Sequence, residues 1–546
     1  MRRRQRGESP MKTDLTRRQA LLLLAQAAGS SAVAFQAARA FGFAADPGEA
    51  QPVQLRPLGE RKRSVIILGA GISGLVSAYE LQRAGYDVTL FEASGRLGGR
   101  NLTVRHGDVI DEAGNRQTCR FDDQPHLYFN AGPARIPAVH TGIMHYCRAL
   151  GVEMELFSNH NKNCFTQDDD AFGGKPMRIR EVEADARGFM AELLAKTLPG
   201  AGLDQPFDAQ DLERLRAFLK SYGDLDHNYR YRGSARAGYA AGGALEPGVI
   251  RDPLAFRELL RTTFTTGPLN WRDMPWPDHG AMNFAEGEDQ APAMLTPRGG
   301  MDQIVQGFAR ALHCDIRLGA HVQRVTLGED GVDIDYRQDG ELRSARGDYC
   351  LNCIPTHLMT GIANNFPVDY NWALGTAQPG KMFKIGLQAS ERFWEAEGIY
   401  AGISWTRQDI TQIWYPQQGI FARKGIVLGA YAWDPAIIDR FAPLDHTQRL
   451  AKALAEGERV HPHGYTRYME NGVSICWHRM NHMMGCNSHW SAEGLERGYP
   501  ILSQPAGRHY MMGDQLSLLS GWQEGAVRSA WRALEDIERR EHAAAV

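Results

Sequence analysis

Three glycines near the start of the chain stand between an expected strand and an expected helix. Gly69, Gly71 and Gly74 follow residues 64–68, an apolar run rich in β-branched side chains that predicts a buried parallel strand. Residues 75–84 have helical spacing, and a second strand over 88–91 ends at Glu92. Glycine permits a tight turn and close approach of the backbone to a pyrophosphate, and a helix N-terminus offers free N–H groups to phosphates. The pattern predicts a dinucleotide site made by Gly69, Gly71, Ile72, Ser73, Gly74 and Glu92, with Glu92 accepting hydrogen bonds from the ribose.

The residues after Glu92 narrow the dinucleotide to FAD. The run Glu-x-x-x-Arg-x-Gly-Gly-Arg over 92–100 resembles the FAD-binding motif of glutathione reductase-like flavoproteins, specifically the amine oxidase branch. A guanidinium fork at Arg100 suits a pyrophosphate oxygen. The resemblance implies that the cofactor also contacts Ala93, Arg96, Gly99 and Arg100.

A segment near the C-terminus predicts the flavin end of the same site. An expected strand over 508–512 is followed by Gly513 and Asp514, and residues 520–526 open an amphipathic helix that runs to about Glu538. This resembles the terminal flavin-binding segment of amine oxidases, where an acidic residue holds a ribityl hydroxyl and the helix N-terminus faces the N1/O2 edge of the ring. Many relatives have Glu where this chain has Asp514. The resemblance implies cofactor contacts from Asp514, Gly521, Trp522, Gln523 and Ala526, and from the backbone of Val322 to adenine.

An arginine between prolines indicates a carboxylate-binding site. Residues 132–137 resemble the Gly-Pro-x-Arg-x-Pro segment of L-amino acid oxidases, including those of snake venom, in which the arginine pairs with the substrate α-carboxylate. A planar guanidinium suits a bidentate contact of this kind. We therefore expect Arg135 to bind the substrate, and Gly132, Pro133, Ala134 and Arg135 to contact the cofactor. The alternative is that Arg135 bridges an FAD phosphate or a structural carboxylate.

The same resemblance implies further substrate contacts in the second half of the chain. Lys384, ten positions before Trp394, matches the lysine that in relatives binds a water beside flavin N5; Lys381 is the alternative. Tyr431 matches the tyrosine that gives a second carboxylate contact. The Gly521 carbonyl is expected to receive the amine, and Trp522 to form a wall of the pocket. We expect Lys384, Arg135 and Tyr431 to be the catalytic residues.

These segments require an α/β architecture. We expect a Rossmann-like FAD-binding domain of the glutathione reductase type, assembled from residues 62–148, 291–362 and 495–546, the last including a C-terminal tail. A mixed-sheet α+β substrate-binding domain is expected over 363–494 and a helical domain over 149–290, where the family resemblance is weakest.

The N-terminus has the pattern of an export signal. Arg17 and Arg18 precede an apolar run over 20–35 and a small-residue cleavage site over 38–40, which predicts a twin-arginine signal peptide over 1–40 and a linker over 41–61. We expect a bacterial periplasmic or secreted protein. Met11 is an alternative start to Met1.

Composition excludes several other classes of protein. Lys plus Arg (61) nearly balance Asp plus Glu (64), so a nucleic-acid partner is not expected. Eight cysteines are too sparse for a disulfide scaffold, and no spacing indicates a metal site. The apolar run of the signal is short for a membrane span, and no other segment is long and apolar enough.

The sequence thus predicts FAD-dependent oxidative deamination of L-amino acids by O2, giving a 2-oxo acid, ammonia and hydrogen peroxide. Alternatives left open are an amino acid 2-monooxygenase that forms an amide, a quinone-linked dehydrogenase, and a flavin-bound protein without catalysis. Glu286, Glu288 and Asp289 would suit an L-arginine- or L-lysine-selective oxidase. The expectation of a homodimer rests on family resemblance alone. Large apolar or aromatic substrates, or a broad range, are favoured by a cluster of Trp433, Trp477, His482, Met483, Met484 and Trp522.

Overall fold

The glycine-rich segment belongs to a five-stranded parallel sheet. Its order is β11 (Asp315–Leu318), β2 (Asp87–Glu92), β1 (Ser64–Leu68), β15 (Tyr349–Asn352) and β24 (His509–Met511). The computed structural model describes residues 51–197, 208–240, 246–262, 264, 281–462 and 464–543. The signal over 1–40 and residues 41–50 of the expected linker therefore lie outside the described residues.

Side chains along β1 point alternately to the two faces of this sheet, and both faces are covered. Val65 and Ile67 pack in a core with the helices α3 (Ile72–Arg83), α9 (Gln303–Ala311) and α17 (Gln523–Ala543). Ile66 and Leu68 face the opposite core, against a four-stranded sheet. The order of that sheet is β14 (Glu341–Gly347), β13 (Val332–Gln338), β12 (His321–Leu327) and β16 (Ala363–Asn364).

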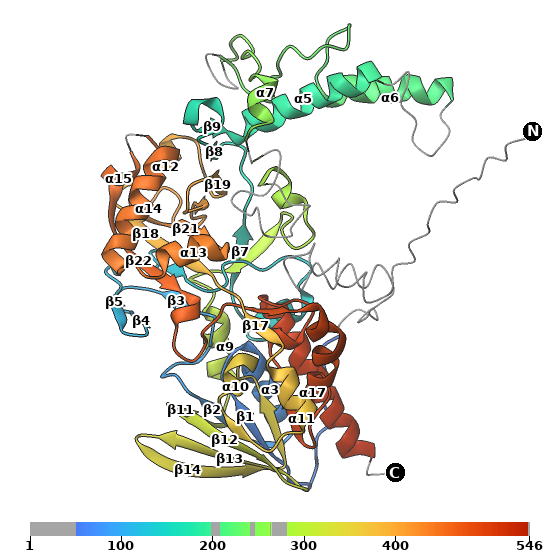
Figure 1. The fold of residues 1–546 in the computed structure, drawn as a ribbon, viewed down its shortest axis with the longest axis vertical. Helices are drawn as coiled ribbons and strands as arrows, with labels where there is room; N and C mark the ends of the chain where they lie inside the picture. Colours follow the sequence, from blue (N-terminus) through green and yellow to red (C-terminus); the bar gives the residue numbers. More distant parts are fainter. Residues whose placement is uncertain are drawn as a thin grey trace, which may run out of the picture.

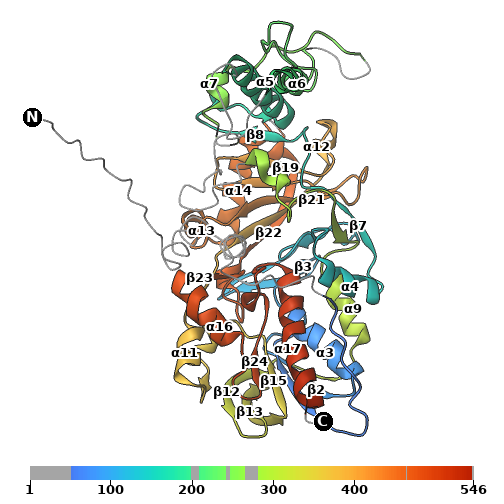
Figure 2. The same ribbon diagram turned by 90° about the vertical axis from the view of Figure 1, so that its right-hand side faces the viewer.

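The five strands come from three distant stretches of the chain. Helices α3 and α17 lie side by side on the sheet although one follows β1 and the other ends the described chain, as Figure 2 shows. The predicted α/β fold with a Rossmann-like cofactor domain is confirmed.

A second, seven-stranded mixed sheet forms the middle of the molecule (Figure 1). Its order is β22 (Met469–Cys476), β18 (Phe383–Ala389), β21 (Gly425–Ala432), β20 (Gln412–Trp414), β19 (Ile403–Thr406), β8 (Phe165–Gln167) and β9 (Met177–Arg178). Every residue of β18 and β21 is buried, and α13 (Pro435–Phe441) and α14 (His446–Val460) cover one face of these strands. This sheet carries both Lys384 and Tyr431.

Helices α5 (Ile179–Thr197), α6 (Ala209–Tyr222) and α7 (Phe256–Leu259) form the end of the molecule opposite the parallel sheet (Figures 1 and 2). The expected helical stretch also contains strands: β8 and β9 join the seven-stranded sheet, and β7 (Met154–Phe157) pairs with β10 (Met294–Pro297). The domain boundaries themselves stay a prediction.

Within the described part of the chain, no helix combines the length and apolarity that a membrane crossing needs.

The remaining α-helices and β-strands are short. They are β3 (Thr103–Val104), β4 (Val109–Glu112), β5 (Asn115–Thr118), β6 (Phe129–Asn130), α4 (Thr141–Ala149), α10 (Thr356–Met359), α11 (Val368–Leu374), β17 (Ala377–Pro379), α12 (Phe393–Ala396), α15 (Tyr465–Tyr468), β23 (Ser488–Trp490) and α16 (Tyr499–Leu502).

Candidate active site

A cavity lies where the N-termini of α3 and α17 meet. The Ser73 hydroxyl donates to the Ala526 carbonyl at 3.0 Å and ties the two helix starts together. Helix N-termini carry unpaired N–H groups and partial positive charge, so this corner favours anionic groups such as phosphates. The lining includes Gly71, Ile72, Ser73, Arg100, Gly132, Pro133, Tyr431, Asp514, Gly521, Trp522, Gln523 and Ala526, all of them expected site residues.

The turn into α3 has the geometry that its glycines predict. Gly69 has a φ of 99°, which favours glycine, and a Cβ on Gly74 would lie 2.0 Å from the Gly69 carbonyl oxygen. A Cβ on Gly71 would meet nothing within 4 Å, because this residue faces open space. The Glu92 carboxylate accepts hydrogen bonds from the backbone of Ala70 and Ser94, both at 2.8 Å, and so fixes the turn. Two helix N-termini beside a bare glycine fit a dinucleotide pyrophosphate.

Two residues predicted to touch different parts of the cofactor are paired with each other. Arg100 binds both carboxylate oxygens of Asp514 and donates to the Cys486 carbonyl at 2.7 Å. The Gly521 N–H also donates to Asp514, at 2.9 Å. The ion pair therefore links the first cofactor segment to the last one. Individual cofactor contacts of Arg100 and Asp514 stay a prediction.

Arg135 lies in the loop between β6 and α4, and this loop is held at several points. A Cβ on Gly132 would lie 1.9 Å from the Arg100 carbonyl oxygen, so this close approach requires glycine. Ile136 exchanges two backbone hydrogen bonds with Leu295, at 2.7 and 2.9 Å. Further along, the buried Glu524 carboxylate accepts from the first N–H groups of α4 and fastens the end of the loop to α17.

The Arg135 guanidinium is buried against two indole rings. Its Cζ lies 4.8 Å from the ring centre of Trp414 and 5.2 Å from that of Trp522. Nη2 donates to the Gln290 side-chain oxygen at 2.7 Å, and the buried Nε has no hydrogen-bond partner among the described residues. Burial lowers the pKa of Arg135, and the nearby Tyr431 and Asp289 oppose that shift. Among the described residues, no carboxylate forms an ion pair with this guanidinium.

Lys384 and Tyr431 face each other on neighbouring strands. They are register partners in β18 and β21, and the lysine Nζ lies 4.4 Å from the centre of the tyrosine ring. Nζ donates to the Gly132 carbonyl at 2.5 Å and lies 3.4 Å from the Asn130 carbonyl. Burial, reinforced by the charge of Arg135, lowers the pKa of Lys384 to about 7.

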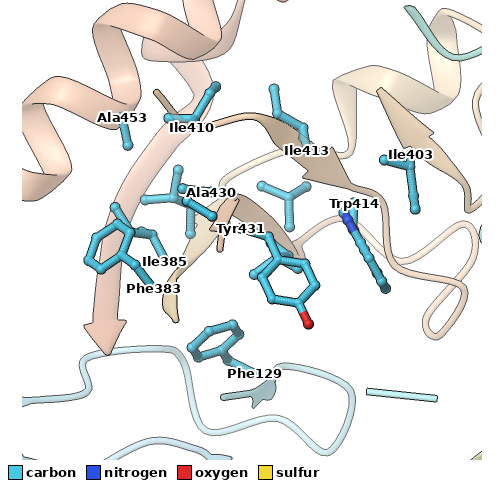
Figure 3. Close-up of a cluster of buried hydrophobic side chains, with 14 of the residues drawn as sticks. Phe129, Phe383, Ile385, Ile403, Ile410, Ile413, Trp414, Ala430, Tyr431 and Ala453 are labelled. Carbon is cyan, nitrogen blue, oxygen red and sulfur yellow. The ribbon is translucent and has the colours of Figure 1, made fainter. Parts of the chain in front are cut away.

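The Tyr431 hydroxyl points out of the apolar cluster beside Trp414, as Figure 3 shows. The two rings meet edge to face with their centres 5.4 Å apart. Burial raises the pKa of Tyr431 to about 12, with Arg135 acting in the opposite direction, so the hydroxyl keeps its proton at neutral pH and can donate a hydrogen bond.

Several expected residues lie behind the cavity rather than on its wall. Arg96 donates to the carbonyls of Leu97, Gly99 and Asn101, which shapes the turn after Glu92. The alternative Lys381 pairs with Asp439 and is more exposed than Lys384. The residues outside the lining are Gly69, Gly74, Glu92, Ala93, Arg96, Gly99, Ala134, Arg135, Val322 and Lys384, whose proposed contacts stay predictions.

Sequence reasoning did not assign a role to other residues of this region. Gln290 and Trp414 contact Arg135, while Cys353 and Cys486 line the cavity. His140 packs edge to face on Trp522 at 4.9 Å, and burial lowers its pKa to about 3, so its ring is neutral. Cys353 belongs to a Cys-x-x-Cys pair to which sequence reasoning assigns no functional role, and no motif marks the others, because their positions here arise from contacts between distant segments.

Comparison with known proteins identifies the class. The chain belongs to the family described as flavin containing amine oxidoreductase, whose model matches residues 72–537, and its cofactor is FAD. It is 26% identical over 500 residues to the flavin-dependent L-tryptophan oxidase RebO of Lentzea aerocolonigenes, covering 87% of this chain and 98% of that protein. It is 24% identical over 486 residues to an L-amino-acid oxidase of Gloydius halys, covering 87% and 89% of the two chains.

Solved structures with the same fold include two amine oxidases. Cyclohexylamine oxidase from Brevibacterium oxydans aligns with a TM-score of 0.58 and 19% identity, over 88% of this chain and 99% of that chain. Putrescine oxidase bound to putrescine aligns with a TM-score of 0.57 and 21% identity, over 87% and 99% of the chains. At this identity, these likenesses concern the fold.

Replacing Gly71 by valine is expected to abolish FAD binding while leaving the fold intact. The new side chain would project into the open space before α3, where no protein atom lies within 4 Å of the Cβ position, and would block the approach of the pyrophosphate. Purified Gly71→Val should be colourless, with a far-ultraviolet circular dichroism spectrum like that of the wild type. Gly375→Val is the control, because Gly375 is exposed, has a φ of −80°, and its Cβ would meet only the Trp372 carbonyl oxygen at 3.5 Å. Yellow Gly71→Val protein with full FAD content would contradict the assignment of the pyrophosphate site.

Proposed function

We propose that this chain catalyses the FAD-dependent oxidative deamination of L-amino acids, giving a 2-oxo acid, ammonia and hydrogen peroxide. The observation that carries the proposal is the buried guanidinium of Arg135, which has no carboxylate partner among the described residues. A buried charge without an ion-pair partner is costly, and a ligand that supplies one relieves that cost. A substrate α-carboxylate meets that need, whereas a plain amine does not.

The neighbouring residues support an orienting role for this site. Arg135 and the protonated Tyr431 hydroxyl would hold the two carboxylate oxygens, and Trp522 would restrict the position of Cα. When bound, FAD supplies the acceptor for a hydride from Cα. The Gly521 carbonyl would receive the amine, and fixing the substrate in this way lowers the barrier by removing rotational freedom before the reaction.

The aromatic residues near Arg135 favour substrates with large apolar or aromatic side chains. Trp414 and Trp522 pack on Arg135, and Tyr431 and Trp477 lie with Trp522 on the wall of the cavity. One relative is named as an L-tryptophan oxidase, which is consistent with this preference. Neither amine oxidase of known structure is named for an amino acid, and Arg135 is the residue that we expect to separate this chain from them.

An anaerobic stopped-flow experiment tests the proposal. The purified yellow protein is mixed with L-amino acids, D-amino acids and amines that lack a carboxylate, and the flavin absorbance near ~450 nm is followed. We expect bleaching by L-amino acids, with aromatic ones fastest, and recovery in air with one peroxide formed per turnover. Faster bleaching by amines would contradict the proposal.

Product analysis in the same reactions separates the other outcomes. An amide product would identify a 2-monooxygenase, and bleaching without rapid recovery in air would identify a dehydrogenase that passes electrons to a quinone.

We also propose export by the twin-arginine route. Changing Arg17 and Arg18 to Lys should then retain the protein in the cytoplasm of a bacterial host, as fractionation would report.

A further inference from the structure

We propose that Gln290 is a positioning residue that makes the enzyme selective for substrates with a carboxylate, because it orients Arg135 without neutralising its charge. This inference rests on the proposed function. Gln290 belongs to a stretch that carries no recognisable motif, between residues 281–286 and β10, and its side chain is buried.

The side chain of Gln290 is fixed against Arg135. Its Oε1 accepts from Arg135 Nη2 at 2.7 Å. Its own backbone is held at both polar groups: the N–H donates to the Gly287 carbonyl at 2.8 Å, and the carbonyl accepts from Asn159 Nδ2 at 2.8 Å. The backbone of Gln290 is thus fixed on both sides, and its buried side-chain oxygen is placed from that fixed backbone against the guanidinium that it contacts.

The two loops that carry the pair are themselves fastened together. Ile136, next to Arg135, forms an antiparallel bridge with Leu295, five residues after Gln290. Leu295 belongs to β10, which pairs along its whole length with β7. The distance between the Arg135 and Gln290 backbones is therefore set by a small sheet and does not depend on the hydrogen bond alone.

The chemical identity of the partner is what matters for selectivity. An amide is neutral, so the hydrogen bond leaves the full positive charge on Arg135, and the unpartnered Nε still has an N–H to donate. A glutamate of the same shape would form a buried ion pair and remove the charge that attracts a carboxylate. Asp289, the preceding residue, acts on Arg135 through its charge.

Two variants separate charge from shape. Gln290→Glu keeps the shape and the acceptor but adds a charge, whereas Gln290→Met keeps the volume and removes the acceptor. Gln378→Glu, on the exposed side of β17, is the matched control for the added charge. Each variant is purified with FAD, and its FAD content and thermal unfolding are recorded first.

The primary readout is binding of benzoate, a carboxylate without an amine, followed by the change in flavin absorbance. We expect the Kd of benzoate to rise by about 100-fold in Gln290→Glu and by about fivefold in Gln290→Met, with no change in Gln378→Glu. The second readout is the ratio of kcat/KM for L-phenylalanine to that for 2-phenylethylamine. It should fall by about 100-fold in Gln290→Glu, through KM more than kcat, and by less than tenfold in Gln290→Met.

The outcomes distinguish this inference from the proposed function. Equal benzoate binding by Gln290→Glu and the wild type overturns the inference, as does a wild type that does not bind benzoate at all. A third outcome separates the two claims: the wild type binds benzoate, Gln290→Glu loses this binding as expected, but no amino acid reduces the flavin. The role of Gln290 would then be retained, and the proposed oxidase activity would be rejected. Equal losses in Gln290→Glu and Gln290→Met would indicate a purely structural role and overturn the inference.

Discussion

Replacing Arg135 by methionine is expected to lower kcat/KM for L-amino acids by about 10³-fold, because a buried hydrogen-bonded charge would be lost from the carboxylate site. The matching decarboxylated amines should be oxidised no more slowly than by the wild type, since the buried positive charge of Arg135 no longer opposes a cationic substrate. Arg135→Met removes a desolvated charge and leaves the thioether in contact with Trp414 and Trp522, so the fold should persist. Steady-state peroxide formation with paired amino acid and amine substrates measures the ratio.

The same variant tests the competing role of Arg135 as a ligand of an FAD phosphate. Under the proposed function, Arg135→Met retains its FAD through purification. Loss of FAD together with unchanged selectivity in reconstituted protein would favour the phosphate role. Arg467→Met, an exposed position on α15, controls for the loss of a positive charge.

The parts of the site that could be predicted from sequence are those that local geometry dictates. Gly69, Gly71 and Gly74 have spacings that a strand, a tight turn and a helix impose, and the structure has this order of elements. Tyr431 and Lys384 were expected from motif resemblance. Their direct apposition depends on the register of β18 against β21, which nothing local in either strand specifies.

The parts that could not be predicted depend on contacts between distant positions. Gln290 lies 155 residues from Arg135, and a single glutamine without periodic context carries no signal. Arg100 and Asp514 are separated by 414 residues, so their separate cofactor roles could be proposed but not their ion pair. β8 and β9 have three and two residues, too few for an alternating pattern to identify them inside a stretch expected to be helical.

Replacing Lys384 by methionine is expected to slow the reoxidation of the reduced enzyme by O2 by about 100-fold at pH ~6, since a buried cation stabilises the negative charge that develops on oxygen. The pKa of Lys384 is lowered to about 7 by burial and by Arg135, so the side chain is a cation below this pH and a neutral amine above it. In the wild type the reoxidation rate should therefore fall as pH rises through about 7. In Lys384→Met it should be low and without that inflection. Stopped-flow mixing of anaerobically reduced protein with O2 at each pH measures both.

Two comparisons make this prediction specific. Lys381→Met removes a lysine that pairs with Asp439 at the surface, and its pH profile should match the wild type. Arg135→Met removes a positive charge that lowers the pKa of Lys384, so the inflection should move to higher pH.

A substrate carboxylate bound to Arg135 should also raise the pKa of Lys384, and binding of amino acid should then be accompanied by proton uptake near pH ~7. An inflection that persists in Lys384→Met would assign the titration to another group and remove Lys384 from the oxygen reaction.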